Sequence, residues 1–396
     1  MTPATIRNPA TLPKAVYALF FGAVACLVPF MTLYYQQTGL TGGQIGILAG
    51  IIPLITLASS PFWGGIADAT GRHKGVLLLT IAGLWFSVLI LYFADGFTAM
   101  LAAVIGYAIF MGPIVPIIDN AVLNILGENK SNYGRVRLWG SVGWGLAVFL
   151  LGPLLERAGL SWSFYGFLIL MAVTFVVASR LPISISGVRQ SYSKGLGFLL
   201  RNGRFLLLLF VALIFGIGLG VLLSYQLIYI AELGGSRTLM ALSLTISTFS
   251  EIPFWFLSSW MLRRMGVSKM IVLALSMASL RMFSLAAMNA PWLVLPISLL
   301  HGPTFAVMWS AGVAEADYAA PEGLGATAQG LFSAAATGLG AALGGFIGGP
   351  AYEAIGFPLL FNIMGWMTLS AMVIYAAFRL MPRWLKQANL IPQKPE

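Results

Sequence analysis

Charged residues are scarce in this 396-residue chain: 22 are Lys or Arg, 12 are Asp or Glu, and together they make up 9%. Soluble domains carry about 25% charged residues, so this chain cannot cover its surface with groups that water solvates. Intrinsic disorder is excluded as well, because it requires low hydrophobicity and high charge. Since 59% of the residues are hydrophobic, we expect lipid to surround most of the surface.

Cysteine is nearly absent. The single cysteine, Cys26, excludes an intrachain disulfide and a cysteine-rich metal site, and we expect it to be a small buried apolar side chain. The glycine-rich stretches lack the lysine of a phosphate-binding loop, which disfavours ATP-driven chemistry. No catalytic triad or metal-ligand cluster is present in the sequence, so we expect no enzyme activity, no cofactor and no metal.

Long apolar runs are what the chain has instead. A helix needs about 20 apolar residues to cross the hydrocarbon layer, and twelve runs meet this length. We therefore expect an all-α membrane protein with twelve transmembrane helices, called spans here. The predicted spans are 14–37, 41–67, 75–94, 97–126, 134–155, 161–181, 205–231, 237–262, 269–288, 291–316, 325–349 and 355–380.

The longest polar interval, 182–204, divides the spans six plus six. We predict an N-terminal six-helix bundle over 1–181, a cytoplasmic linker over 182–204 and a C-terminal bundle over 205–396. The halves also repeat each other, since Gly112-Pro113 of span four matches Gly302-Pro303 of span ten. Duplicated six-span halves are typical of transporters that rock around a central site.

The basic residues show the orientation. If the N-terminus is cytoplasmic, 18 Lys and Arg residues lie inside and only Arg157 and Arg237 lie outside. Cytoplasmic loops are enriched in Lys and Arg, so we predict that both termini are cytoplasmic, in a bacterial inner membrane. The net charge of +10 is spread between the apolar runs, which disfavours nucleic acid as a partner.

Four charges lie within the predicted spans, and each costs about 2.5–3.5 kcal/mol at the bilayer centre. Asp119 of span four and Arg137 of span five are equally far from the turn between them. Such opposite charges should pair, because neither is stable alone. The alternative interpretation is that a pair of this kind only locks two helices together.

Glu251 of span eight and Arg281 of span nine repeat this pattern nearer mid-membrane, and His301 of span ten reaches a similar depth. We expect these three side chains to form one cluster. A carboxylate near an arginine can exchange its partner for a proton, which would link transport to protonation. A purely structural cluster, or a hydrogen-bonded core histidine, is the alternative.

The loop after span two reads Gly64…Asp68…Gly71-Arg72, which resembles the loop signature of the major facilitator superfamily. We expect its glycines to let spans two and eleven approach closely, and Asp68 to bind a helix N-terminus or an arginine. The alternative is an ordinary charged turn. Near the end of span ten, Glu315, Asp317 and Glu322 are expected to be solvated, with a contact to Arg72 or Lys74 as the alternative.

Three segments resemble the lactose permease and phenylpropionate permease branch of that superfamily. They are Tyr133-Gly134-Arg135-Val136-Arg137-Leu138-Trp139-Gly140-Ser141-Val142-Gly143-Trp144, Ser250-Glu251-Ile252-Pro253 and Leu300-His301-Gly302-Pro303-Thr304-Phe305. The resemblance implies the major facilitator fold, with two pseudo-symmetric bundles. It also implies that Asp119 pairs with Arg137, that Trp144 stacks on substrate, and that Arg281 belongs to the site. Thr304 stands where lactose permease has a carboxylate, so proton coupling would fall on Glu251, Asp119 or His301.

The sequence thus predicts a monomeric secondary transporter, most simply a proton symporter of a sugar, nucleoside or aromatic acid working by alternating access. Proton-driven efflux of drugs or metabolites and a membrane receptor that does not transport remain as alternatives. The predicted substrate-binding residues are Arg137, Trp144, Arg281, Gln226, Tyr107 and Trp309.

Overall fold

The structure is a computed structural model that describes residues 11–183, 196–321 and 324–380. All regular elements in these residues are helices. The first half has α1 (Thr11–Leu27), η1 (Val28–Phe30), α2 (Met31–Gln37), α3 (Gly42–Thr70), α4 (His73–Phe93), α5 (Gly96–Met111), α6 (Ile114–Leu126), η2 (Gly127–Asn132), α7 (Tyr133–Ala158) and α8 (Ser161–Ala178).

The second half continues the pattern. It has α9 (Leu196–Leu199), α10 (Gly203–Glu232), α11 (Arg237–Met265), α12 (Val267–Ala286), η3 (Pro291–Leu293), α13 (Val294–Ser298), α14 (His301–Ala319), α15 (Gly325–Ser333), the π-helical η4 (Ala334–Gly340) and α16 (Ala341–Leu380). Several short elements join end to end into single spans: α1 to α2, α5 to α6, and η3 to α14.

Eleven helical segments in the described residues are long and apolar enough to cross a membrane. The last, Gly325–Arg379, has 55 residues, more than twice the length that a bilayer of about 30 Å requires. It breaks at Gly356, whose φ of 76° and ψ of 162° are not helical, and so makes two spans. The predicted all-α fold with twelve spans is confirmed, and most boundaries differ by only a few residues.

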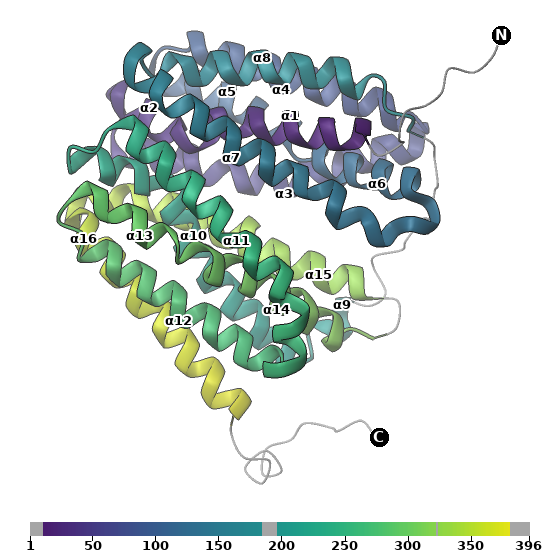
Figure 1. Ribbon diagram of the computed structural model, residues 1–396, viewed down its shortest axis with the longest axis vertical. Coiled ribbons are helices and arrows are strands. Elements are labelled where there is room, and N and C mark those ends of the chain that lie inside the picture. The colour runs from purple at the N-terminus through teal and green to yellow at the C-terminus, as the bar shows by residue number, and fades with distance from the viewer. Residues whose placement is uncertain (1–10, 184–195, 322–323, 381–396) are drawn as a thin grey trace.

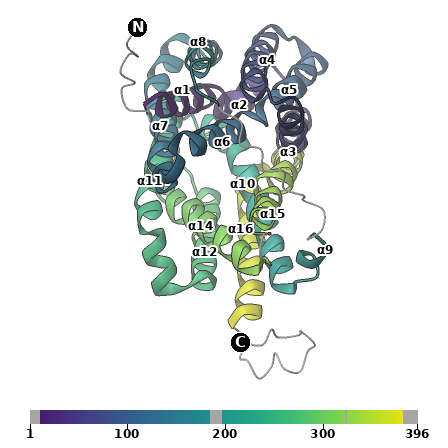
Figure 2. The same cartoon turned by 90° about the vertical axis from the view of Figure 1, so that its right-hand side faces the viewer.

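The spans form two bundles (Figures 1 and 2), with α1 to α8 in one and α10 to α16 in the other. The predicted division at 1–181, 182–204 and 205–396 stays a prediction. Residues 184–195 of the proposed linker lie outside the described part, and α10 already begins at Gly203. Cys26 is buried, as expected.

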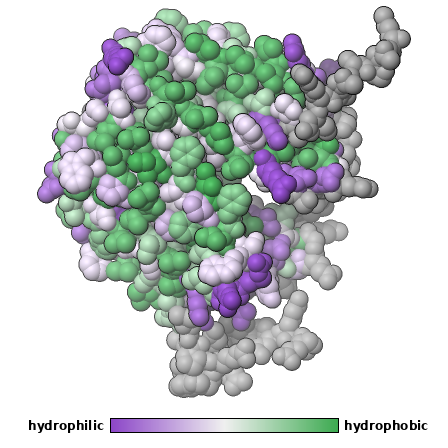
Figure 3. Space-filling model, in the orientation of Figure 1, coloured by the Kyte–Doolittle hydropathy of each residue, from purple (hydrophilic) through white to green (hydrophobic). Residues whose placement is uncertain are grey.

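The outer surface of the spans is apolar. Large hydrophobic side chains such as Phe86, Leu150, Phe256 and Trp366 are more than half exposed, and Figure 3 shows a broad hydrophobic face that runs over both bundles. Exposed apolar surface of this extent is unfavourable in water. It is what a lipid-facing exterior requires, in line with the composition.

Glycines set the distance between spans two and eleven, but they are not those of the loop signature. A Cβ on Gly64 would meet nothing within 4 Å, so the expected role for this residue is wrong. The close approach is made nearer the start of α3, where Gly46 faces the carbonyl oxygens of Gly345 and Phe346. Gly344, Gly345 and Gly349 of span eleven likewise lie too close to neighbouring backbone atoms to accept a Cβ.

The two bundles contact each other through polar groups at one end only, among the described residues. There Thr32 of α2 donates to the carbonyl oxygen of Ser224 at 2.5 Å, and Gly42 of α3 donates to Glu353 of α16. At the other end the described ion pairs lie within a single bundle. Figure 3 shows an opening between the bundles at that end, which carries α6 and α15 in Figure 1.

We predict that Gly143→Ala destabilises the protein, because the added Cβ would overlap the backbone of Ala18 where α1 packs on α7. Overpacking of this kind costs about 1–3 kcal/mol, and thermal unfolding in detergent would show a clear drop in Tm. Gly64→Ala is the matched control: with no neighbour within 4 Å and a better helix former in place, its Tm should be unchanged or slightly higher.

Candidate functional site

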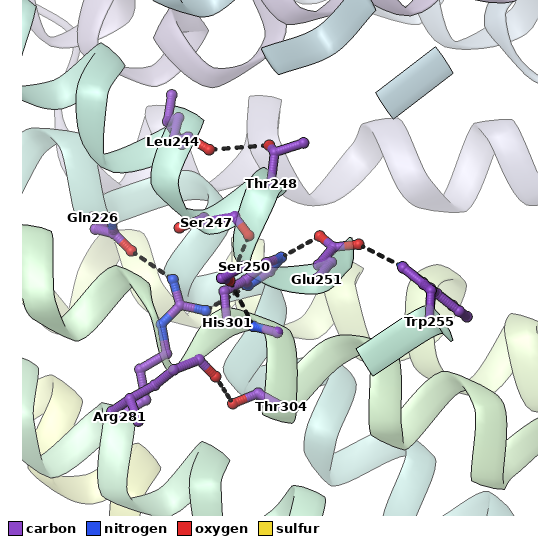
Figure 4. Close-up of polar contacts among 12 residues, drawn as sticks. Gln226, Leu244, Ser247, Thr248, Ser250, Glu251, Trp255, Arg281, His301 and Thr304 are labelled. Atoms are coloured by element: carbon purple, nitrogen blue, oxygen red, sulfur yellow. Dashed lines mark hydrogen bonds and ion pairs between the residues drawn. The ribbon is translucent and has the colours of Figure 1, made fainter. Parts of the chain in front are cut away.

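The C-terminal bundle gathers four polar side chains from four helices (Figure 4): Gln226 of α10, Glu251 of α11, Arg281 of α12 and His301 of α14. His301 lies in the middle. Its Nε2 is 3.0 Å from Oε1 of Glu251, and its Nδ1 is 2.6 Å from Nη1 of Arg281. Nη2 of Arg281 donates to Oε1 of Gln226 at 3.4 Å. The expected cluster is therefore formed, with the histidine between the two charges.

These contacts fix the proton on the imidazole. An arginine has only donors, so Nδ1 of His301 must accept from Arg281. Nε2 then carries the hydrogen and donates to Glu251. The histidine is thus neutral in this arrangement, an assignment that follows from the hydrogen-bond network. A second proton on Nδ1 could not coexist with the contact to Arg281.

Neighbouring groups hold Glu251 and His301 in place. The indole Nε1 of Trp255, one turn along α11, donates to Oε2 of Glu251 at 3.1 Å, so both carboxylate oxygens are hydrogen-bonded. The amide of Gly302 donates to Oγ of Ser250 at 2.9 Å. A Cβ on Gly302 would overlap the carbonyl oxygen of Ser250, so only glycine permits α11 and α14 to approach this closely beside the histidine.

A mainly apolar pocket adjoins the cluster, lined by Phe215, Leu219, Leu222, Met282 and Phe305 among others, with Arg281 and His301 as its ionisable groups. Arg281 is only 3% exposed, and its Nε has no hydrogen-bond partner in the described residues. A buried donor without a partner is costly. This buried N–H would therefore be stabilised by an additional hydrogen-bond acceptor.

Three rings stack along α14 from the same site. His301 and Phe305 lie 5.6 Å apart with an interplanar angle of 4°, and Phe305 and Trp309 lie 5.6 Å apart at 25°. The residues are four apart, so they share one helix face. Trp309, a predicted substrate-binding residue, is thus connected to the cluster through Phe305, which sequence reasoning did not single out.

The N-terminal bundle has a different arrangement. Asp119 and Arg137 form no direct ion pair, although their charges are close enough to interact electrostatically. The carboxylate of Asp119 accepts from the hydroxyl of Tyr17 at 2.5 Å. The guanidinium of Arg137 lies over the ring of Phe21, 4.1 Å from its centroid, a favourable cation–π geometry. Arg137 is only one turn from the start of α7, nearer the open end than its spacing indicated. Its guanidinium is free of ion pairs among the described residues.

The two remaining predicted substrate contacts differ in burial. Tyr107 is 1% exposed and packs in the hydrophobic core of the N-terminal bundle, so it does not line an open cavity in this structure. Trp144 is half-buried on α7, beside Gly145, whose Cβ would lie 3.1 Å from the ring of Phe249 on α11. This places the α7 backbone at Trp144 beside α11, whereas the contact with Phe249 belongs to Gly145, because successive helix residues point in different directions.

The loop after span two is a compact turn. Gly71 ends α3 in the left-handed conformation, with φ at 66°, which favours glycine. Oδ1 of Asp68 lies 2.9 Å from Nε2 of His73, so the expected partner, a helix N-terminus or an arginine, is replaced by a histidine. The backbone amide of Arg72 donates to Oγ1 of Thr70. No hydrogen bond or ion pair among the described residues links this loop to the C-terminal bundle.

Glu315 is not solvated and does not bind Arg72 or Lys74. It lies 2.7 Å from Nη2 of Arg379, and the side chains of this pair are 9% and 17% exposed. The pair joins α14 to α16, spans ten and twelve, at the open end. No sequence pattern indicated it, because Arg379 lies at the very end of the last apolar run and was assigned to the cytoplasm. Asp317 is exposed, as expected, and Glu322 lies outside the described residues.

The sequence model of the MFS_1-like family matches residues 11–363. The chain belongs to this family, within the major facilitator superfamily of transporters. It is 31% identical over 355 residues to the maltose permease of Geobacillus stearothermophilus, covering 87% of this chain and 89% of the relative. It is 27% identical over 306 residues to the probable 3-phenylpropionic acid transporter of Escherichia coli strain K12, covering 74% and 78%.

Among solved structures, a point mutant of the nucleoside transporter NupG superposes with a TM-score of 0.85 over 94% of this chain and 100% of NupG, at 18% identity. This likeness establishes the major facilitator fold. The family relationship confirms the resemblance seen in the three sequence segments. As a member of a transporter family, the chain is not an enzyme.

We predict that Glu315→Gln lowers stability, because it leaves the guanidinium of Arg379 poorly solvated and without its carboxylate. Breaking a buried pair costs about 3–5 kcal/mol, whereas replacing both partners is often neutral. Tm should therefore fall in Glu315→Gln and recover in the double variant Glu315→Gln/Arg379→Gln.

Asp317→Asn, a change of the same kind at an exposed site two residues along the chain, should leave Tm within error of the wild type. Equal Tm values for Glu315→Gln and Asp317→Asn would show that the pair with Arg379 contributes nothing to stability.

Proposed function

We propose that this transporter is a proton-coupled symporter of a small organic solute. The observation that supports the proposal is the position of His301, with Glu251 on one ring nitrogen and Arg281 on the other. Charged and titratable side chains at this depth are costly and tend to be functional. Its relatives include a maltose permease and a probable 3-phenylpropionic acid transporter, and its fold neighbour is a nucleoside transporter. The solute classes therefore remain a sugar, an aromatic acid or a nucleoside.

The coupling follows from competition for one atom. A proton that binds Nδ1 of His301 must displace Nη1 of Arg281, because the protonated Nδ1 and the arginine Nη1 would both be hydrogen-bond donors. Released from the histidine, Arg281 keeps its contact with Gln226 and has its remaining N–H groups free for solute oxygens. A proton on Glu251 instead would weaken its attraction for His301. Either route links protonation to the availability of Arg281.

The second face of the site would come from the N-terminal bundle. There Arg137 has a guanidinium free of ion pairs among the described residues, and Trp144 is on α7, the helix that packs on α11. A solute bound by Arg281 and Gln226 on one side and by Arg137 and Trp144 on the other would connect the two bundles, as alternating access requires. Trp309 would offer a ring beside the path, and Asp119 remains a competing proton carrier in the N-terminal bundle.

The orientation is part of the same proposal. With both termini in the cytoplasm of a bacterial cell, the open end carrying α6 and α15 faces the cytoplasm, and the closed end faces outward. We propose that the protein works as a monomer, because each chain contains both bundles and therefore a complete site.

We predict that Glu251→Gln abolishes uptake driven by a pH gradient in proteoliposomes, because the side chain keeps its shape but cannot exchange a proton. Solute exchange at equal pH on both sides should persist, since it needs no net proton movement. Asp119→Asn tests the competing carrier in the other bundle: it should retain gradient-driven uptake if Glu251 carries the proton, and loss of uptake in this variant alone would move the assignment to Asp119. Unchanged pH-driven uptake in Glu251→Gln would contradict the assignment of the proton to this carboxylate.

A thermal-shift screen of sugars, nucleosides and aromatic acids at two pH values should identify the solute class. A ligand that binds the folded state at a concentration about 100 times its Kd stabilises it by about 2.7 kcal/mol. We expect a pH-dependent hit that Arg281→Ala and Arg137→Ala remove. Stabilisation by lipophilic cations, with no response to polar solutes, would favour efflux. Saturable binding without flux in proteoliposomes would favour a receptor.

A further inference from the structure

An eight-residue pattern occurs twice in the chain, at the ends of spans five and eleven. It reads Gly-Pro-x-x-Glu-x-x-Gly, over Gly152–Gly159 and over Gly349–Gly356. In both copies the final glycine has positive φ, 92° at Gly159 and 76° at Gly356, and ends the helix. The two copies take equivalent places in the two halves, because five and eleven are corresponding spans of a six-plus-six repeat.

The glutamate of each copy binds the first residue of a helix in the opposite bundle. Oε2 of Glu156 accepts from the amide of Arg237 at 2.6 Å, and from that of Thr238 at 3.4 Å. Oε1 of Glu353 accepts from the amide of Gly42. Arg237 is the first residue of α11, which is span eight, and Gly42 is the first residue of α3, which is span two. Spans eight and two are again corresponding spans of the six-plus-six repeat.

The helix starts are built alike. Each is preceded by a hydroxyl residue in extended conformation, Thr41 with ψ of 157° and Ser236 with ψ of 157°. Each hydroxyl accepts from the third amide of its helix. The cap therefore satisfies the third amide, and the glutamate from the other bundle satisfies the first. A carboxylate at this position also interacts favourably with the helix dipole.

The first glycine of each copy makes room for the contact. A Cβ on Gly152 would lie 2.5 Å from the Cβ of Ala241 on α11, and one on Gly349 would overlap the carbonyl oxygen of Gly42. One turn later along the same helix face come Glu156 and Glu353. Arg237 adds a further bond on one side, from Nη1 to the carbonyl oxygen of Leu155 at 2.7 Å.

We infer that Glu156 and Glu353 are a symmetric pair of conformational latches, each formed by a carboxylate and the helix start it caps, which hold this end of the transporter closed. Opening this end separates α7 from α11 and α16 from α3, so both carboxylates lose their partners together. The inference concerns the equilibrium between the closed and open forms of this end and does not depend on which solute is carried or whether a proton accompanies it.

The experiment measures that equilibrium directly. Spin labels are placed at Asp95→Cys and Asn289→Cys, exposed positions in loops of the two bundles at the same end, in a Cys26→Ala background. Distances are recorded by double electron–electron resonance in nanodiscs. We expect Glu156→Ala and Glu353→Ala each to raise the ratio of long to short distances by about five-fold, the effect of about 1 kcal/mol. The double variant should combine both effects.

Glu232→Ala is the matched control, because Glu232 is an exposed carboxylate at the same end whose side chain makes no hydrogen bond across the bundles in the described residues. Its distance distribution should equal that of the parent. If neither latch variant shifts the distribution, or if Glu232→Ala shifts it equally, the inference is wrong.

A second comparison tests the backbone amide of Arg237, the donor to Glu156, and leaves both carboxylates in place. Proline is well tolerated as the first residue of a helix, and the extended Ser236 before it suits a following proline. Arg237→Pro removes the amide that Glu156 binds, whereas Arg237→Ala keeps it and removes only the side chain. We expect a larger open fraction in Arg237→Pro than in Arg237→Ala. Equal fractions in two variants with wild-type elution volume would overturn the latch at this position.

Discussion

The buried charge of Arg281 is the constraint around which the polar cluster of the C-terminal bundle is organised. It lies 3% exposed among four helices, where an ion without partners is strongly disfavoured. Its neutralisation is indirect: the nearest described acceptors are an imidazole nitrogen and an amide oxygen, and Glu251 acts through the histidine. A buried cation held by neutral groups is incompletely compensated. In the proposed mechanism, this incomplete compensation is what would let Arg281 bind solute oxygens and let the histidine respond to a proton.

The second constraint is steric and lies in the glycines. Backbone contacts at Gly46, Gly143 and Gly302 bring helices together more closely than any side chain would allow. Membrane helices lack a strong hydrophobic drive to associate, and small residues compensate by allowing extensive packing. In this chain the glycines also have separate tasks. Gly143 packs within one bundle, Gly46 packs between bundles, and Gly302 sets the position of the titratable cluster.

Much of this could be predicted from the sequence, for physical reasons. The number of spans followed from the lengths of the apolar runs. The C-terminal cluster followed from the similar membrane depth of Glu251, Arg281 and His301, because the hydrocarbon layer offers these side chains no other polar partners. Depth did not predict the contacts of Asp119 and Arg137, because it gives no side-chain direction. Tyr17 of α1 donates to Asp119 and Phe21 of α1 lies beneath Arg137, while the two charges interact without a direct ion pair. The pair of Glu315 and Arg379 was missed because both residues were assigned to solvated cytoplasmic ends.

The repeated Gly-Pro-x-x-Glu-x-x-Gly pattern shows that the two halves are alike at the closed end of the molecule, although they differ in its interior. At the closed end the two halves use the same glycine, the same carboxylate and the same helix position, so each half contributes equally to closure. In the interior the halves differ, since among the described residues only the C-terminal bundle joins Arg, His and Glu through hydrogen bonds, while Arg137 packs on an aromatic ring. A transporter needs both properties. Under the proposed mechanism, symmetric closure would let the two bundles move as a balanced pair, and the asymmetric site would give the proton one place at which to act on that movement.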